Sequence, residues 1–212
     1  MENEFLNGKK RITTLSNVKL GGNILQVNMP AITSCRPDAP CKSGCYCNRG
    51  PLFYVRKHHI ERMNAYLECP LDFFERISEE IIASGIKTFR WHSSGDIVDE
   101  NYFILMCHLA KACPDVSFLA FTKKYEIVNG YLDNGGVIPK NLTVIFSTWG
   151  SDWEVPNPYR LPMSFVRTGD AEFDSIIPAT AYECPGYCGD CSRGTCSCWS
   201  LGNGDSVVFD KH

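Results

Sequence analysis

The sequence has no apolar run long enough to cross a membrane, and its opening residues, MENEFLNGKK, lack the apolar segment of a secretory signal. It contains no P-loop, GxGxxG or HExxH motif, so nucleotide hydrolysis, Rossmann-type cofactor binding and zincin proteolysis have no motif support. A net charge of −3 provides no long-range attraction for nucleic acid or an anionic membrane. We therefore expect a cytoplasmic protein without a membrane or nucleic-acid partner.

Cysteine, by contrast, is abundant: the 212 residues include twelve. A hydrophobic content of 44% and an aromatic content of 12% are typical of a folded globular chain with a substantial core. In the cytoplasm thiols stay reduced, so this many cysteines favour metal ligation over disulfides. A secreted disulfide scaffold is the alternative, although such scaffolds are usually short and lack long α/β patterns.

Two short basic segments stand out at Lys9–Arg11 and Arg56–His59. Charge runs of this length usually form solvated faces, and we interpret both segments in that way. His58 and His59 are adjacent on a predicted helix, where side chains point about 100° apart, so the pair makes a poor joint metal site. We expect both histidines on the helix surface and residues 1–22 at the periphery of the fold.

Strand and helix patterns alternate along the rest of the chain. Helices are predicted over residues 51–67, 70–84, 99–113 and 124–132, and strands over residues 24–29, 88–92, 116–121, 142–147, 163–167, 175–178 and 206–209. This alternation implies parallel strands with right-handed crossovers. About six strands are fewer than the eight of a closed barrel. We predict an open, partial parallel β/α barrel over residues 1–180 and a cysteine-rich, metal-binding segment over residues 181–212.

Functional loops of such folds follow the carboxyl ends of the strands. The predicted strands place five loops there, at residues 35–47, 92–96, 122–124, 147–149 and 167–169. We therefore expect these loops to border one common site.

The first of these loops carries four cysteines, Cys35, Cys41, Cys45 and Cys47, which we name the first cysteine group. Thiolates are soft ligands that select iron–sulfur clusters or zinc. Three thiolates would leave one iron of a 4Fe–4S cluster open to a ligand, whereas four would close the site. Zinc remains the alternative metal, although the paired C-x2-C knuckles typical of zinc sites are absent from this loop.

Five more cysteines lie near the other end of the sequence and form the C-terminal cysteine group: Cys184, Cys188, Cys191, Cys196 and Cys198. Glycine and proline separate them, and the C-x2-C spacing of Cys188 and Cys191 is a recognised knuckle for zinc or iron–sulfur. The sequence leaves open whether the two groups share one site. Cys69, Cys107 and Cys113 are isolated, and the last two fit core packing on a helix.

Between the two groups, the segment Arg90–Asp96 (RWHSSGD) places polar residues just beyond an apolar strand. Gly95 permits a tight turn or a close approach to a ligand, and Ser94 and Asp96 supply hydrogen-bond acceptors. The alternative is that Ser93 or Asp96 caps the helix that begins near Asp99. His92 is a candidate acid–base group, metal ligand or satisfied polar residue.

The CKSGCY loop, the RWHSSGD segment and the closing cysteines before Trp199 resemble a bacteriophage gene-product-eighty-eight-like family over residues 24–212. A cysteine loop after the first strand, with an aromatic residue beside its last members, is also similar to the radical-SAM superfamily. The chain departs from that pattern at Asn48, where the usual spacing would have a cysteine. A phage origin would imply a host-cytoplasmic location.

The radical-SAM resemblance implies a 4Fe–4S enzyme that cleaves S-adenosylmethionine to act on an unknown substrate, with an external electron donor. It implies that the residues following the second strand bind this cofactor, namely Ser93, Ser94, Gly95 and Asp96. Asp96 would accept hydrogen bonds from the cofactor's ammonium group and, with His92, is a candidate catalytic residue. The alternative is a non-catalytic binding, redox or sensor protein that is stabilised by zinc or by a closed iron–sulfur cluster.

Overall fold

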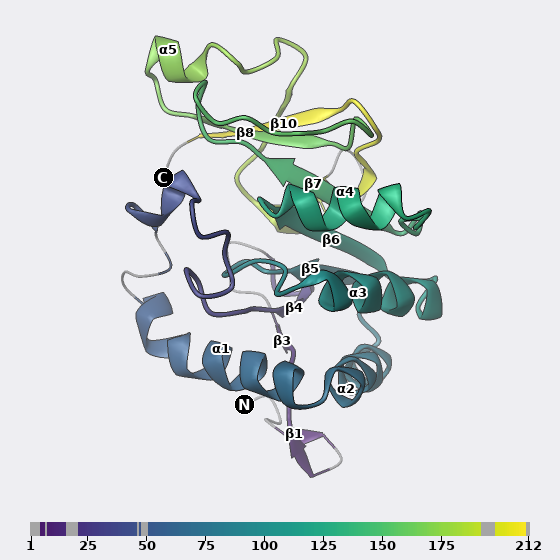
Figure 1. The fold of residues 1–212 in the computed structure, drawn as a ribbon. Coiled ribbons are helices and arrows are strands. Elements are labelled where there is room, and N and C mark those ends of the chain that lie inside the picture. The colour runs from purple at the N-terminus through teal and green to yellow at the C-terminus, as the bar shows by residue number, and fades with distance from the viewer. Residues whose placement is uncertain are drawn as a thin grey trace.

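The computed structural model describes residues 5–6, 8–15, 21–45, 47, 51–191 and 198–210. They form an α/β fold around one open sheet of eight strands, shown in Figure 1. In spatial order these are β3 (Thr14–Leu15), β4 (Leu25–Val27), β5 (Thr88–Trp91), β6 (Ser117–Thr122), β7 (Leu142–Ser147), β8 (Met163–Arg167), β10 (Ser206–Asp210) and β9 (Tyr182–Glu183). All neighbouring pairs are parallel except β3 and β4. A small hairpin, β1 (Phe5–Leu6) with β2 (Lys9–Lys10), lies outside the sheet.

Four helices provide most of the α layer: α1 (Pro51–Glu68), α2 (Pro70–Ser84), α3 (Glu100–Ala112) and α4 (Tyr125–Asp133). Proline at the first position starts α1 and α2, where its missing N–H costs no helical hydrogen bond. The Asp99 carboxylate caps α3 by accepting from the amide of Tyr102 at 2.8 Å. No helix among the described residues is long and apolar enough to span a membrane.

The helices cover one face of the sheet, with α3 and α4 in front of it in Figure 1. Phe89, Trp91 and Phe118 point from the central strands into this side, where they pack with aromatic residues of the helices such as Phe73 and Tyr102. Because side chains alternate along a strand, the intervening residues face the opposite side. This face carries a cross-strand row of Gln26, Arg90, Leu119 and Thr143.

The C-terminal segment covers part of this second face, which we call the helix-free face. Cys198 is buried there against Leu119, Ile145 and Val207, and Trp199 packs at the margin of the same cluster. The Thr143 hydroxyl donates to the Trp199 carbonyl at 2.8 Å. A cysteine-rich segment with only short helical turns, α6 (Cys188–Cys191) and η4 (Cys198–Ser200), therefore occupies the place of a second helical layer.

The mostly parallel α/β sheet expected from the sequence is confirmed, and the sheet is not closed into a barrel. It has eight strands where about six were predicted. The two strands that were not predicted are β3 and β9, which have only two residues each. β3 also places part of residues 1–22 within the sheet. Strand β10 pairs with β8 and β9, so residues 206–210 are part of the same sheet as the rest of the fold.

Two local predictions are wrong. Residues 175–178 form no strand, because local backbone hydrogen bonds turn the chain after the short helix α5 (Ala171–Asp174). The amide of Ser175 donates to the Glu172 carbonyl at 3.3 Å, and the amide of Ile177 donates to the Asp174 carbonyl at 3.0 Å. His59 is buried, whereas His58 is exposed as predicted. The two neighbours diverge because adjacent helical side chains point in different directions.

Candidate metal and ligand site

The loops after β4 and β5 lie side by side at the carboxyl edge of the sheet. The amide of Met29 donates to the Ser94 carbonyl at 3.0 Å, and the amide of Ser94 donates to Asn28 Oδ1 at 3.1 Å. The Ser94 hydroxyl adds a bond to the Met29 carbonyl at 3.2 Å. These bonds fix the RWHSSGD segment against the chain that leads into the first cysteine group.

Gly95 is the point of closest approach between the two loops. Its φ is +81°, and a Cβ built on it would lie 2.6 Å from both the Met29 carbonyl oxygen and the Ser34 hydroxyl. Only glycine fits this backbone without displacing a neighbour. Because Ser34 precedes Cys35, the glycine also helps to set the position of the first cysteine.

The Asp96 carboxylate is buried, with 6% of the residue exposed, and its oxygens bind groups of the chain. Oδ1 accepts from the Thr122 hydroxyl at 2.6 Å and from the Ile97 amide at 2.8 Å, and Oδ2 accepts from the Lys123 amide at 3.0 Å. Burial raises the pKa of Asp96, while these donors oppose the rise. Asp96 thereby ties the loop after β5 to the end of β6, and Asp99 is the residue that caps α3.

His92 lies at the end of β5 with φ +52° and 5% exposure. Its Nε2 lies 3.1 Å from the Tyr102 hydroxyl, and its buried Nδ1 has no hydrogen-bond partner among the described residues. Burial, assisted by the charge of Lys124, lowers the pKa of His92 to about 3. The imidazole is therefore neutral near pH 7, and a catalytic role for it stays a prediction.

Three cysteines of the first group gather beside Asp96. Burial, together with the nearby charges of Asp96, Cys41 and Cys45, raises the pKa of Cys35 to about 11. Cys41 sits in the short helix η2 (Pro40–Lys42), and Cys47 is buried. The thiols of Cys35, Cys41 and Cys45 are thus within electrostatic range of one another at the carboxyl edge.

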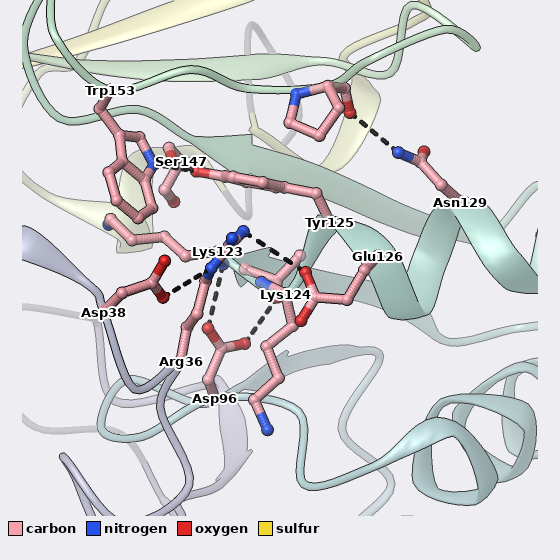
Figure 2. A network of polar contacts seen from close by, with 12 residues as sticks. Arg36, Asp38, Asp96, Lys123, Lys124, Tyr125, Glu126, Asn129, Ser147 and Trp153 are labelled. Carbon is pink, nitrogen blue, oxygen red and sulfur yellow. Dashed lines mark hydrogen bonds and ion pairs between the residues drawn. The ribbon is translucent and has the colours of Figure 1, made fainter.

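A cation and two aromatic rings border this group. The Arg36 guanidinium lies 5.7 Å from the centre of the Tyr125 ring and 5.2 Å from that of Trp153. Figure 2 shows Arg36 directed toward Asp38 and Glu126, with which it pairs at 2.7 and 3.4 Å. These residues were not predicted from the sequence. Arg36 is marked only by its position next to Cys35, and nothing in the sequence marks Trp153.

The described members of the C-terminal cysteine group also converge. Burial, together with the neighbouring thiols of Cys184, Cys191 and Cys188, raises the pKa of Cys198 to about 12. Cys196 lies outside the described residues. Arg90 points from β5 into this group: its guanidinium donates to Cys188 Sγ at 3.3 Å and lies 5.1 Å from the centre of the Phe121 ring.

The two groups occupy different places, one at the carboxyl edge of the sheet and the other on the helix-free face. The eleven described cysteines are not joined to one another by disulfides. Within the described part of the chain, no three His, Cys, Asp or Glu side chains are grouped so that they could hold a metal ion. The thiols therefore lie in two separate groups, and among the described residues neither group forms a closed coordination shell around a metal ion.

The donor type nevertheless fits an iron–sulfur cluster. Such clusters are ligated almost entirely by cysteine thiolates. In a 4Fe–4S cluster each iron takes its own cysteine, so the ligand sulfurs need not surround a single atom as they do around zinc. Hydrogen bonds and positive charge near the sulfurs are part of the usual environment of a cluster. Arg90 offers both to the C-terminal group.

Fold and site together define an α/β protein with an open, mostly parallel sheet that gathers thiols at its carboxyl edge and on its helix-free face. The chain belongs to the Gene product 88 family, whose model matches residues 3–171. The match includes the first cysteine group and the RWHSSGD segment and ends before the C-terminal group. No curated protein and no solved structure matches the chain, so the comparisons lend no support to the radical-SAM resemblance.

Proposed function

We propose that this chain is an iron–sulfur protein whose C-terminal cysteine group holds a cluster on the helix-free face of the sheet. The observation that carries the proposal is the convergence of three buried or half-buried thiols on the buried Cys198, with Arg90 bonded to one of them, Cys188. The segment that bears them has little regular structure of its own, and a bound cluster would fix it to the sheet. Cys184, Cys188, Cys191 and Cys198 are the proposed ligands, with Cys196 as a further donor.

The surroundings of this group suit an electron-transfer centre. A bound cluster supplies one-electron chemistry. Leu119, Ile145 and Val207 limit the access of water to the buried Cys198, and Arg90 places a positive charge beside Cys188. A thiolate-rich centre is anionic, so this arginine would stabilise it and favour its reduced state.

The first cysteine group is the proposed second centre. Cys35, Cys41 and Cys45 lie beside the RWHSSGD segment at the carboxyl edge, where parallel α/β sheets bind their ligands. This placement favours the finer proposal that a three-cysteine cluster with an open iron binds S-adenosylmethionine. Ser93, Ser94 and Gly95 would line that ligand.

The contacts of Asp96 favour a non-catalytic redox or sensor protein instead. Its carboxylate already accepts three hydrogen bonds from the chain, so contact with a cofactor ammonium would require an exchange of partners. His92 is equally enclosed. These two observations support a non-catalytic redox or sensor protein, with both cysteine groups closed around their clusters or around zinc.

Single cysteine variants test the two centres separately. Cys191→Ala is expected to remove the C-terminal cluster and leave the first, and Cys45→Ala is expected to do the reverse. Cys69→Ala is the matched control, because Cys69 is exposed and lies outside both groups. Iron and sulfide are measured per chain after anaerobic reconstitution. If Cys45→Ala removed all metal, the two groups would form one shared site, and the proposal of two centres would be wrong.

The enzyme is distinguished from the redox or sensor protein by adding S-adenosylmethionine to the reduced protein and measuring released methionine. Release that is lost in Cys45→Ala and kept in Cys69→Ala would support the enzyme. A reducible cluster with no release would support the redox or sensor protein.

A further inference from the structure

The two basic segments of the sequence meet in the folded protein. Hairpin strand β2 and helices α1 and α2 surround a surface hollow of about 190 Å³. Four of the side chains that line it are cationic: Lys10, Arg11, Arg62 and Arg76. His58 also lines the hollow, and Glu61 is its acidic residue.

Specific bonds hold this arrangement together. Lys10 Nζ lies 3.1 Å from His58 Nδ1 and forms an ion pair with Glu61 at 3.0 Å. Arg76 donates to the Lys10 carbonyl at 2.5 Å, which joins α2 to the hairpin. Asp72 pairs with Lys9 at 2.8 Å and with Arg76 at 3.7 Å. Lys10 and Arg76 are thus partly neutralised.

Two arginines are not neutralised in this way. Arg62 is half-buried and forms no hydrogen bond or ion pair with the residues that the structure describes. Burial lowers the pKa of Arg62, while Glu80 and Glu61 oppose the change from a distance. The oxygens of Glu80 are occupied by the amides of Ile12 and Thr13 and by the Thr13 hydroxyl. Arg11 Nε is also buried and has no hydrogen-bond partner among the described residues.

A guanidinium shielded from water without a paired acceptor is energetically unfavourable, and an anion in the hollow would supply that acceptor. Phosphate matches the need, because its several oxygens can accept from both arginines and guanidinium groups bind phosphate in a bidentate manner. Pockets that enclose whole ligands measure roughly 300–1,000 Å³, so a smaller hollow suits a phosphate group and not the whole molecule that carries it.

We propose that the hollow between β2, α1 and α2 is a binding site for the phosphate group of a small phosphorylated ligand, with Arg11 and Arg62 as its principal contacts. The site is independent of the proposed clusters, because no cysteine contributes to it.

Inorganic phosphate is the probe. The thermal unfolding temperature of the full chain is measured against phosphate concentration, with sodium chloride at matched ionic strength as the reference. Phosphate is expected to raise this temperature in a saturable way, since a ligand that binds only the folded state stabilises it. Arg62→Gln is expected to weaken the apparent affinity by about tenfold or more. Arg56→Gln is the control, because Arg56 is an exposed cation on the same helix outside the hollow.

Arg11→Gln provides a second test if Arg62→Gln fails to fold, and the same weakening is expected. An equal response to chloride and phosphate would overturn the proposal, as would equal affinities in the Arg62→Gln and Arg56→Gln proteins. A short DNA duplex distinguishes general charge attraction. If both variants weakened duplex binding equally, and phosphate did not raise the unfolding temperature, the hollow would be a solvated basic face without a phosphate site.

Discussion

Gly95→Ala is expected to destabilise the protein by about 2–5 kcal/mol and to disturb the first cysteine group. Two effects contribute. An alanine held at positive φ costs about 1–2 kcal/mol, and the new Cβ would lie 2.6 Å from the Met29 carbonyl oxygen and from the Ser34 hydroxyl. Forcing an additional methyl group into a packed site typically costs about 1–3 kcal/mol more. Relief of the contact requires movement of Ser34 and therefore of Cys35.

Gly85→Ala is the matched control. Gly85 ends α2 with φ +65°, and nothing lies within 4 Å of a Cβ built on it. This variant therefore measures the backbone strain alone, at about 1–2 kcal/mol. Urea unfolding of both variants at pH 7 gives the two losses, and iron per chain gives the effect on the clusters. Equal losses of stability, with the first centre intact in both, would refute the close packing of the two loops.

Two further predictions concern the charges near the site. Arg90→Gln is expected to keep the proposed C-terminal cluster but to make its reduction potential more negative, because a positive charge beside Cys188 is removed. A redox titration that gives the wild-type potential would contradict the placement of Arg90. His92→Asn is expected to reduce the acid sensitivity of the fold. The pKa of His92 is lowered from 6.5 to about 3, so the unfolded state binds more protons between these values and stability falls as the pH drops through 6.5 toward 3. Between pH 6.5 and 5 this one group accounts for a loss of about 2 kcal/mol. Buried His59, whose pKa is lowered to about 4, adds a loss of its own in every variant. Urea unfolding at the two pH values should therefore show a loss in His92→Asn that is about 2 kcal/mol smaller than in the wild type and in the exposed-histidine control His108→Asn.

The elements that the sequence predicts well are those with local signals at both ends. Helix α2 runs over the predicted residues because Pro70 starts it and Gly85 ends it in the left-handed conformation. Strand β8 likewise has the predicted bounds. Strands β3 and β9 have two residues each, too few to show a period, and they are defined only by the strands beside them. Residues 175–178 have apolar strand-like residues, but the amides of Ser175 and Ile177 donate to backbone carbonyls of α5 and turn the chain instead.

For the candidate site, residue type and loop position predict where the thiols gather but not what surrounds them. Cys35 and Cys45 are recognisable from their spacing alone. Arg90 lies inside an apolar strand, and its partner Cys188 is 98 residues away, so only the folded chain brings the two together. The same holds for the hollow between β2, α1 and α2, whose basic segments are 48 residues apart at Lys10 and His58. Each segment by itself has the appearance of a solvated face.

The central claim is that these thiols hold iron and sulfide, and the most direct test is the content of iron, acid-labile sulfide and zinc per chain after anaerobic purification. We expect a brown protein with iron and sulfide in equal amounts and with little zinc. A colourless protein that binds zinc alone, or one that binds no metal while its thiols remain reduced, would contradict it.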